Sequence, residues 1–270
     1  MDQEKRDWTV VAVVSAGWNP SSDDPLAEYT RGQAKALIPI AGRPMIAYVV
    51  EALSQSRYVK HILIVALDPA ADVTFSVPVE YLPDAGDILS NAESGFDYAL
   101  AHYPEADAIL LSTSDVPMIT GPIVDALVEE CLRTNHDLYY SIIERTTMEG
   151  RFPESRRSYI HLREGDFAGG DLLLARPSLA VENHDLWLRL AEARKSALRQ
   201  ARLIGLGLFF KLLIRRLSIA DAEQRIGRVL NLRGRAIPFP YAELGMDVDK
   251  PFQLEIVRAE LEGHAHASQP

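Results

Sequence analysis

The first half of the chain alternates segments typical of buried strands with segments typical of helices. Residues 8–15, 61–67 and 107–113 are runs of β-branched and aliphatic residues, and residues 44–54 and 86–102 carry apolar side chains at helical spacing. Strands that alternate with helices in this way connect through right-handed crossovers and pair in parallel. The sequence therefore predicts an α/β fold with a mostly parallel sheet, doubly wound over its first half.

The third predicted strand ends at a carboxylate. Its apolar residues are followed by Ser114, Asp115, Val116 and Pro117. The carboxyl end of a parallel strand opens onto the crevice in which α/β folds bind ligands. Because carboxylate oxygens are suitable ligands for a hard divalent cation, Asp115 is the first candidate for a site that binds a nucleotide with Mg²⁺.

The composition limits the class of protein. With 270 residues, 47% of them hydrophobic, the chain is long enough for one large α/β domain. The single cysteine, Cys131, excludes an internal disulfide, and no charged and then apolar leader precedes the first strand. We therefore expect a single domain over residues 1–270 in a reduced, cytoplasmic protein. The net charge of -10 argues against nucleic-acid binding, because an acidic surface repels phosphate backbones.

The pattern is less regular after residue 140. A charged loop at 151–157 precedes two short predicted strands, at 159–162 and 171–175, which lie on either side of a turn at Gly169 and Gly170.

A basic segment follows at residues 185–235, which have the pattern of helices and carry twelve Lys or Arg against four Asp or Glu. We expect a basic helical insertion there, whose charges are either solvated or bind an anion. Its most apolar stretch, residues 203–210, is too short to span a bilayer. A core helix, a partner-facing surface and a peripheral membrane contact stay open as alternatives, with the membrane contact not favoured.

Five short motifs lie along the chain in a fixed order. They are Ala-Gly at 16–17, Lys-Ala-Leu at 35–37, Gly-Arg-Pro-Met at 42–45, Ser-Asp-Val-Pro at 114–117 and Asp-Val-Asp-Lys-Pro at 247–251. In this order and spacing they resemble the signatures of the nucleotidyltransferases similar to the molybdenum-cofactor guanylyltransferase. Each motif alone is weak, but the five together are specific, and the resemblance covers nearly the whole chain.

The resemblance implies a fold, a donor and a set of site residues. The fold would be three-layered, with a seven-stranded mixed sheet of the nucleotide-diphospho-sugar transferase type, and the donor a nucleoside triphosphate with Mg²⁺ as cofactor. The implied catalytic residues are Lys35 and Asp115, and Mg²⁺ would be held by Asp115, Asp247 and Asp249. The nucleotide would contact Ala16, Gly17, Lys35 and Asn91, with Arg31 as a further candidate, and the acceptor would contact Gly169, Gly170 and Asp171. For a phosphorylated acceptor, Arg157 and Lys195 are candidates by their charge.

The chain departs from the family pattern in its first loop. Trp18 and Asn19 follow Gly17 where the family has a second glycine, and Ala34 precedes Lys35 where the family has proline. Arg31 is the candidate for the cation that the family carries earlier in the loop. The longer stretch at 24–28 and the Gly-Gly-Asp at 169–171 resemble an uncharacterised branch of these enzymes.

The chemistry of the acceptor and two rival functions stay open. None of the seven histidines lies beside a motif, which favours a phosphorylated acceptor, since a phosphate oxygen is already ionised and needs no general base. The Asp-x-Asp at 247–249 also fits a glycosyltransferase that uses a nucleotide-sugar, and the altered glycine loop fits a non-catalytic nucleotide-binding module. The absence of Gly-x-Gly-x-x-Gly after the first strand argues against a dehydrogenase. The base, the acceptor and the oligomeric state are not specified by the sequence.

Overall fold

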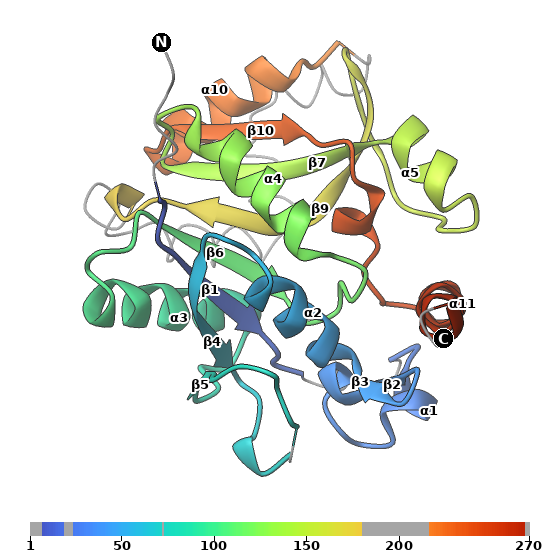
Figure 1. Cartoon of the computed structure of the whole chain (residues 1–270). Coiled ribbons are helices and arrows are strands. Elements are labelled where there is room, and N and C mark those ends of the chain that lie inside the picture. Colours follow the sequence, from blue (N-terminus) through green and yellow to red (C-terminus); the bar gives the residue numbers. More distant parts are fainter. Residues whose placement is uncertain (1–6, 19–23, 72, 180–215, 268–270) are drawn as a thin grey trace.

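The computed structural model describes residues 7–18, 24–71, 73–179 and 216–267, which fold around one large sheet (Figure 1). In the described part of the chain this sheet has eight strands, and seven of them follow one path in the order β10-β7-β9-β6-β1-β4-β5. The eighth strand, β8, pairs only with β9. The strands span Val10–Ser15 (β1), Val59–Val65 (β4), Glu80–Leu82 (β5), Ala108–Thr113 (β6), Leu138–Glu144 (β7), Ile160–Leu162 (β8), Gly165–Ala175 (β9) and Gly234–Pro238 (β10).

The sheet is mixed and mostly parallel. β1 is parallel to both β4 and β6, β5 is parallel to β4, and β10 is parallel to β7. β9 runs antiparallel between β6 and β7, so these two neighbours point in the same direction. The predicted α/β class is confirmed, and the seven strands implied by the family resemblance correspond to the main path, with β8 added beside it.

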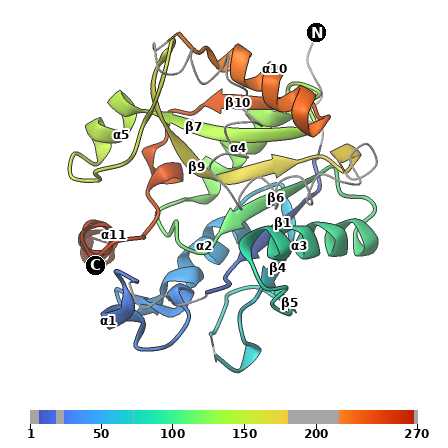
Figure 2. The ribbon, with the colours of Figure 1, turned by 180° about the vertical axis from the view of Figure 1, so that it is seen from behind.

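Helices cover both faces of the sheet (Figures 1 and 2). One face carries α2 (Met45–Ser54) and α4 (Gly121–Leu132), and the other carries α3 (Ile88–His102) and α10 (Ile219–Leu230). Successive side chains of a strand point to opposite faces. Accordingly Val10, Ala12 and Val14 of β1 are buried with α2 and α4, whereas Val11 and Val13 are buried with α3. The continuous apolar run of β1 is therefore explained by burial on both sides.

The regular first half was predicted well and the second half less so. The three predicted strands and two predicted helices correspond to β1, β4, β6, α2 and α3, with ends shifted by up to two residues. Neither β7 nor α5 (Arg145–Arg151) was anticipated. The helical pattern assigned up to residue 235 was wrong at its end, because β10 begins at Gly234 and forms the edge of the sheet.

The predicted turn at Gly169 and Gly170 was also wrong, since both glycines lie inside β9. A Cβ on Gly169 would overlap the hydroxyl of Tyr140, and a Cβ on Gly170 would overlap the hydroxyl of Ser141. Glycine in a strand interior often marks such a close approach. The pair therefore allows β9 to pack against side chains of β7.

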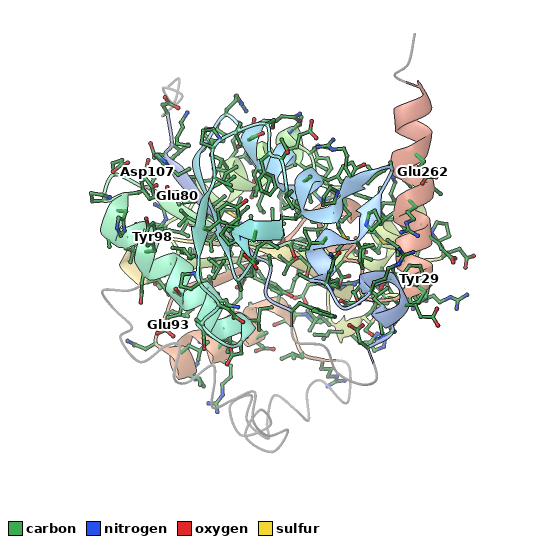
Figure 3. All side chains as sticks on the ribbon, turned by 90° about the horizontal axis from the view of Figure 1, so that it is seen from below. Tyr29, Glu80, Glu93, Tyr98, Asp107 and Glu262 are labelled. Atoms are coloured by element: carbon green, nitrogen blue, oxygen red, sulfur yellow. The ribbon has the colours of Figure 1, made fainter. Side chains whose placement is uncertain are left out.

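A smaller group of elements packs beside the sheet. It comprises α1 (Ala27–Thr30), the 3-10 turn η1 (Lys35–Leu37), the hairpin of β2 (Pro39–Ile40) and β3 (Arg43–Pro44), and the long C-terminal helix α11 (Pro251–Ala267). Arg258 of α11 donates a hydrogen bond of 2.9 Å to the carbonyl of Pro39, which ties the C-terminal helix to the hairpin. Figure 3 shows Tyr29 and Glu262 on this side of the molecule, opposite Glu80 and Tyr98.

Two further 3-10 turns, η2 (Pro69–Ala71) and η3 (Ala242–Gly245), complete the described elements. Most of the basic segment expected at 185–235, including residues 203–210, lies outside the described residues. Within them, no helix combines the length and the apolar character needed to cross a membrane.

Candidate active site

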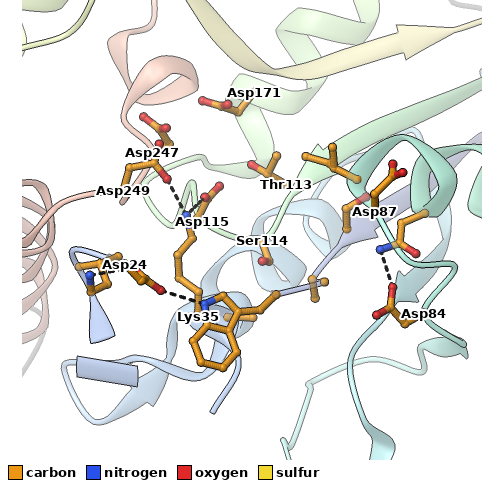
Figure 4. A pocket seen from close by; sticks show the side chains of 18 of the residues that line it. Asp24, Lys35, Asp84, Asp87, Thr113, Ser114, Asp115, Asp171, Asp247 and Asp249 are labelled. Atoms are coloured by element: carbon orange, nitrogen blue, oxygen red, sulfur yellow. Dashed lines mark hydrogen bonds and ion pairs between the residues drawn. The ribbon is translucent and has the colours of Figure 1, made fainter. Parts of the chain in front are cut away.

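A cavity of about 1030 Å³ lies at the carboxyl ends of β1 and β6 (Figure 4). It is strongly acidic, because seven aspartates and two lysines line it. The charged lining residues are Asp24, Lys35, Asp84, Asp87, Asp115, Asp171, Asp247, Asp249 and Lys250, and the others include Ala16, Gly17, Trp18, Ile88, Asn91, Thr113 and Ser114.

Three side chains that are far apart in sequence meet in this cavity. The ammonium group of Lys35 forms an ion pair with Oδ2 of Asp115 and a second one, 2.7 Å long, with Oδ1 of Asp249 (Figure 4). Burial on its own would lower the pKa of Lys35, but the two neighbouring carboxylates outweigh it and raise the pKa above its usual value. The structure thus brings together the lysine and two of the aspartates that the motifs singled out.

The backbone explains why these residues converge. β6 ends at Thr113, so Asp115 lies just beyond the carboxyl end of a central strand. The backbone N–H of Val248 donates to the carbonyl of Asp115 at 2.9 Å, which fixes the segment that carries Asp247 and Asp249 beside it. Lys35 opens the turn η1 on the other side of the cavity. Each side chain therefore comes from a separate part of the fold.

Two carboxylates of the cavity keep an oxygen without a partner. Asp115 is only 9% exposed, and its Oδ1 is buried and makes no hydrogen bond. Oδ2 of Asp171, on β9, is in the same condition. Burial, followed by the charge of Asp115, raises the pKa of Asp171 to about 7. Buried polar atoms are normally paired, so these two oxygens are available to a ligand.

Asp247 and Arg157 neutralise each other. They form an ion pair in which both side chains are largely buried. Asp247 had been expected to hold a metal and Arg157 to bind the acceptor. Each lies at or beside the cavity, but each already has a charged partner.

The nucleotide-contact candidates Ala16, Gly17 and Asn91 line the cavity. A Cβ on Gly17 would lie 2.6 Å from Nδ2 of Asn91, so the glycine is needed for this close approach. The amide of Asn91 is buried and accepts a hydrogen bond from the N–H of Ala85 at 2.7 Å, while its Nδ2 donates to Asp84 at 3.1 Å. Asn91 therefore shapes the wall of the cavity rather than presenting a free amide to it.

Three of the other candidates do not line the cavity. Arg31 is exposed at the C-terminal end of α1 in a left-handed conformation, with φ of 50°. Gly169 and Gly170 are enclosed in β9, where packing against β7 accounts for them. Lys195 lies outside the described residues.

Trp18 and Asp24 were not among the candidates, although they line the cavity. The indole N–H of Trp18 donates to Oδ2 of Asp24 at 3.1 Å, and Oδ1 of Asp24 accepts from the N–H of Leu26 at 2.8 Å. The bulky residue that replaces the family glycine is thus anchored at the rim. In the sequence, Trp18 was noted only as a departure from the family loop, and Asp24 only as the start of the stretch 24–28.

A hard cation fits the donor atoms of the site. The unpartnered oxygens of Asp115 and Asp171 are carboxylate oxygens, which Mg²⁺ prefers. No three His, Cys, Asp or Glu side chains of the described residues are grouped so that they could hold a metal as they stand. The ammonium of Lys35 lies instead between Asp115 and Asp249.

Comparison with known families agrees with these features. The model of the MobA-like NTP transferase domain matches residues 30–201, well over half of the chain. The chain belongs to this family. This is the family that the five motifs indicated, and membership favours a nucleotidyltransferase over a glycosyltransferase or a non-catalytic binding module.

Three of the proteins similar to this chain match different shares of its length. A hypothetical transferase from Thermus thermophilus is 34% identical, with a TM-score of 0.79 over 91% of this chain and 99% of that one. A 3-deoxy-manno-octulosonate cytidylyltransferase from Synechococcus elongatus is 30% identical over 95 residues, which are 35% of this chain and only 38% of that relative. A 4-diphosphocytidyl-2C-methyl-D-erythritol synthase from Anaerococcus prevotii is 10% identical, with a TM-score of 0.56 over 95% of this chain and 100% of that one, and shows a shared fold.

Proposed function

We propose that the protein transfers a nucleoside monophosphate from a nucleoside triphosphate to a phosphorylated small molecule and releases pyrophosphate. The observation that supports this most strongly is the meeting of Lys35, Asp115 and Asp249 in one cavity at the carboxyl ends of β1 and β6. In an α/β fold this is the expected place for a ligand.

The part of the cavity that would bind the nucleoside triphosphate needs added positive charge. The cavity is lined by seven aspartates against two lysines, so it repels a bare triphosphate. Asp115 and Asp249 would hold Mg²⁺, with Asp171 as a further donor. When bound, the ion would offset the negative charge of the phosphates during the displacement. Lys35 would contact the triphosphate, and Ala16 and Gly17 would line the surface along which the triphosphate lies.

The acceptor side favours a group that is already ionised. No histidine lines the described part of the cavity, and a phosphate monoester needs no base at neutral pH. Arg157, whose charge acts on Asp171, would lie near the acceptor. The masking of Arg157 by Asp247 would be relieved if the acceptor phosphate replaced the carboxylate, because arginine binds phosphate in two-point contacts.

A hydroxyl acceptor is the second candidate, and Asp171 is the observation that favours it. Its carboxylate has an unpartnered oxygen, and its pKa is raised to about 7, which is the range of a general base at neutral pH. A phosphate acceptor gives a diphosphate product with two coupled phosphorus signals, whereas a hydroxyl acceptor gives a single phosphodiester signal. The nature of the bond in the product therefore separates the two.

The test is a screen of four nucleoside triphosphates, with Mg²⁺, against panels of phosphorylated and unphosphorylated metabolites. Pyrophosphate release identifies the active pair, and phosphorus NMR of the product identifies the bond. Asp115→Asn should lower pyrophosphate release strongly. Glu105→Gln is its matched control, because Glu105 is exposed and lies just before the opposite end of the same strand, β6. No pyrophosphate release from any pair by the folded wild-type protein would contradict the proposal.

A further inference from the structure

Lys35 lies where the proposed function requires a cation. Its ammonium is paired with both Asp115 and Asp249, the two carboxylates that would hold Mg²⁺. An ammonium and a metal ion compete for the same carboxylate oxygens, so Lys35 and a divalent cation cannot both bind Asp115 and Asp249 fully.

We propose that Lys35 excludes divalent cations from Asp115 and Asp249 until the triphosphate of the donor draws its ammonium group away. This inference rests on the proposed function and adds an order of binding to it. A metal ion alone binds weakly, and it binds tightly only together with the nucleotide.

The burial of the pair makes the competition effective. The side chain of Lys35 is 21% exposed and that of Asp115 is 13% exposed, so water screens their attraction poorly. Oδ1 of Asp115 is buried and has no partner at all. The carboxylate is therefore only half satisfied by the lysine, and an ion that contacts both of its oxygens gains a contact that Lys35 does not provide.

The geometry also allows the lysine to leave. Asp249 is 57% exposed on its side chain, which makes this half of the arrangement the weaker one. Lysine has a flexible four-carbon stem, so its ammonium can follow a stronger anion without movement of the backbone. A triphosphate carries more negative charge than the two carboxylates together, and it enters the same cavity.

The test measures Mn²⁺ binding by electron paramagnetic resonance, with and without a non-hydrolysable nucleoside triphosphate and without acceptor. In the absence of nucleotide, Lys35→Met should bind Mn²⁺ about tenfold more tightly than wild type, equivalent to about 1.4 kcal/mol. Lys250→Met is the matched control: it removes the same charge from the same cavity, but Lys250 forms no ion pair with Asp115 or Asp249 among the described contacts. It should change the affinity by less than about threefold, or about 0.7 kcal/mol.

A second variant tests where the added affinity comes from. Lys35→Met combined with Asp249→Asn should lose the gain, because one of the two carboxylates is gone. Thermal melting checks that each variant is folded, and Lys35→Ala replaces Lys35→Met if that protein does not fold. Wild-type-like Mn²⁺ affinity in a folded Lys35 variant overturns the inference, as does an equal gain in Lys250→Met. These measurements involve no turnover, so they are separate from a failure of pyrophosphate release.

Discussion

Two buried aspartates at opposite ends of the strands differ in how their charges are satisfied. Asp137, just before β7, is 1% exposed, and its two oxygens accept four hydrogen bonds of 2.5–3.1 Å: three from the backbone and guanidinium of Arg233 and one from Ser178. Asp115, just after β6, contacts Lys35 through one oxygen and leaves the other unpaired.

The difference separates a carboxylate whose oxygens are fully paired within the fold from one that has an oxygen available to a ligand. Burial alone would raise the pKa of Asp137, but the hydrogen bonds from Arg233 and Ser178 outweigh it and hold the pKa below its usual value. Asp137 links the starts of β7 and β10 to the segment after β9, and both of its oxygens are used in these hydrogen bonds. An unpaired buried oxygen costs folding free energy, so its presence at Asp115 indicates that another partner completes it.

The largest expected effect is on catalysis by Asp115→Asn. The substitution should lower pyrophosphate release by about 10³-fold. A neutral amide binds a divalent cation more weakly than a carboxylate does, so the charge of the triphosphate is less well offset. The free energy of unfolding should change by less than about 1 kcal/mol, since Lys35 keeps Asp249 as a partner. Steady-state kinetics and urea unfolding measure the two quantities. A large loss of stability with normal turnover would make Asp115 a structural residue like Asp137.

Asp137→Asn should show the reverse pattern. We expect it to lower the free energy of unfolding by about 2 kcal/mol, because the charge-assisted hydrogen bonds to Arg233 are lost. The contribution of the wild-type carboxylate is present at neutral pH and lost as the pH falls through its lowered pKa. Urea unfolding gives the stability, and turnover per folded molecule should stay within about twofold of wild type. Ser178→Ala, which removes only one of the four hydrogen bonds, should cost less.

The sequence identified only one of these two aspartates as important. Asp115 was identified because an apolar run ended at a carboxylate, a local pattern that places it at the carboxyl end of a central strand. Lys35 and Asp249 followed from motifs in a recognisable order. Asp137 gave no signal, because its partners Arg233 and Ser178 are distant in sequence and it precedes a strand that alternates irregularly.

The errors also have physical causes. Gly169 and Gly170 predict a turn by their composition, but tertiary packing against Tyr140 and Ser141 requires them in a strand. Arg157 was a sound choice by charge, yet sequence alone cannot show that Asp247 already neutralises it. Local patterns therefore locate a strand end, whereas the state of each side chain depends on contacts across the fold.

The smallest expected effect concerns Asp171, which has an unpaired oxygen like Asp115 and lies on β9, between β6 and β7. Its pKa is raised from 3.8 to about 7 in the folded protein, chiefly by burial. Between these two pH values the folded state binds the proton more tightly than the unfolded state does. Stability should therefore fall as the pH rises through this window, which is opposite to the behaviour of Asp137.

Asp171→Asn removes this loss of stability because the amide does not ionise. In metal-free buffer the variant should gain about 1 kcal/mol over wild type at pH 8, or roughly 2–4 °C in Tm, and much less at pH 4. Thermal melting across this range measures the difference, with Glu105→Gln as an exposed control that should follow wild type at every pH. A pH-independent difference would mean that Asp171 is ionised throughout, and that it belongs with Asp137 as a satisfied carboxylate rather than with Asp115.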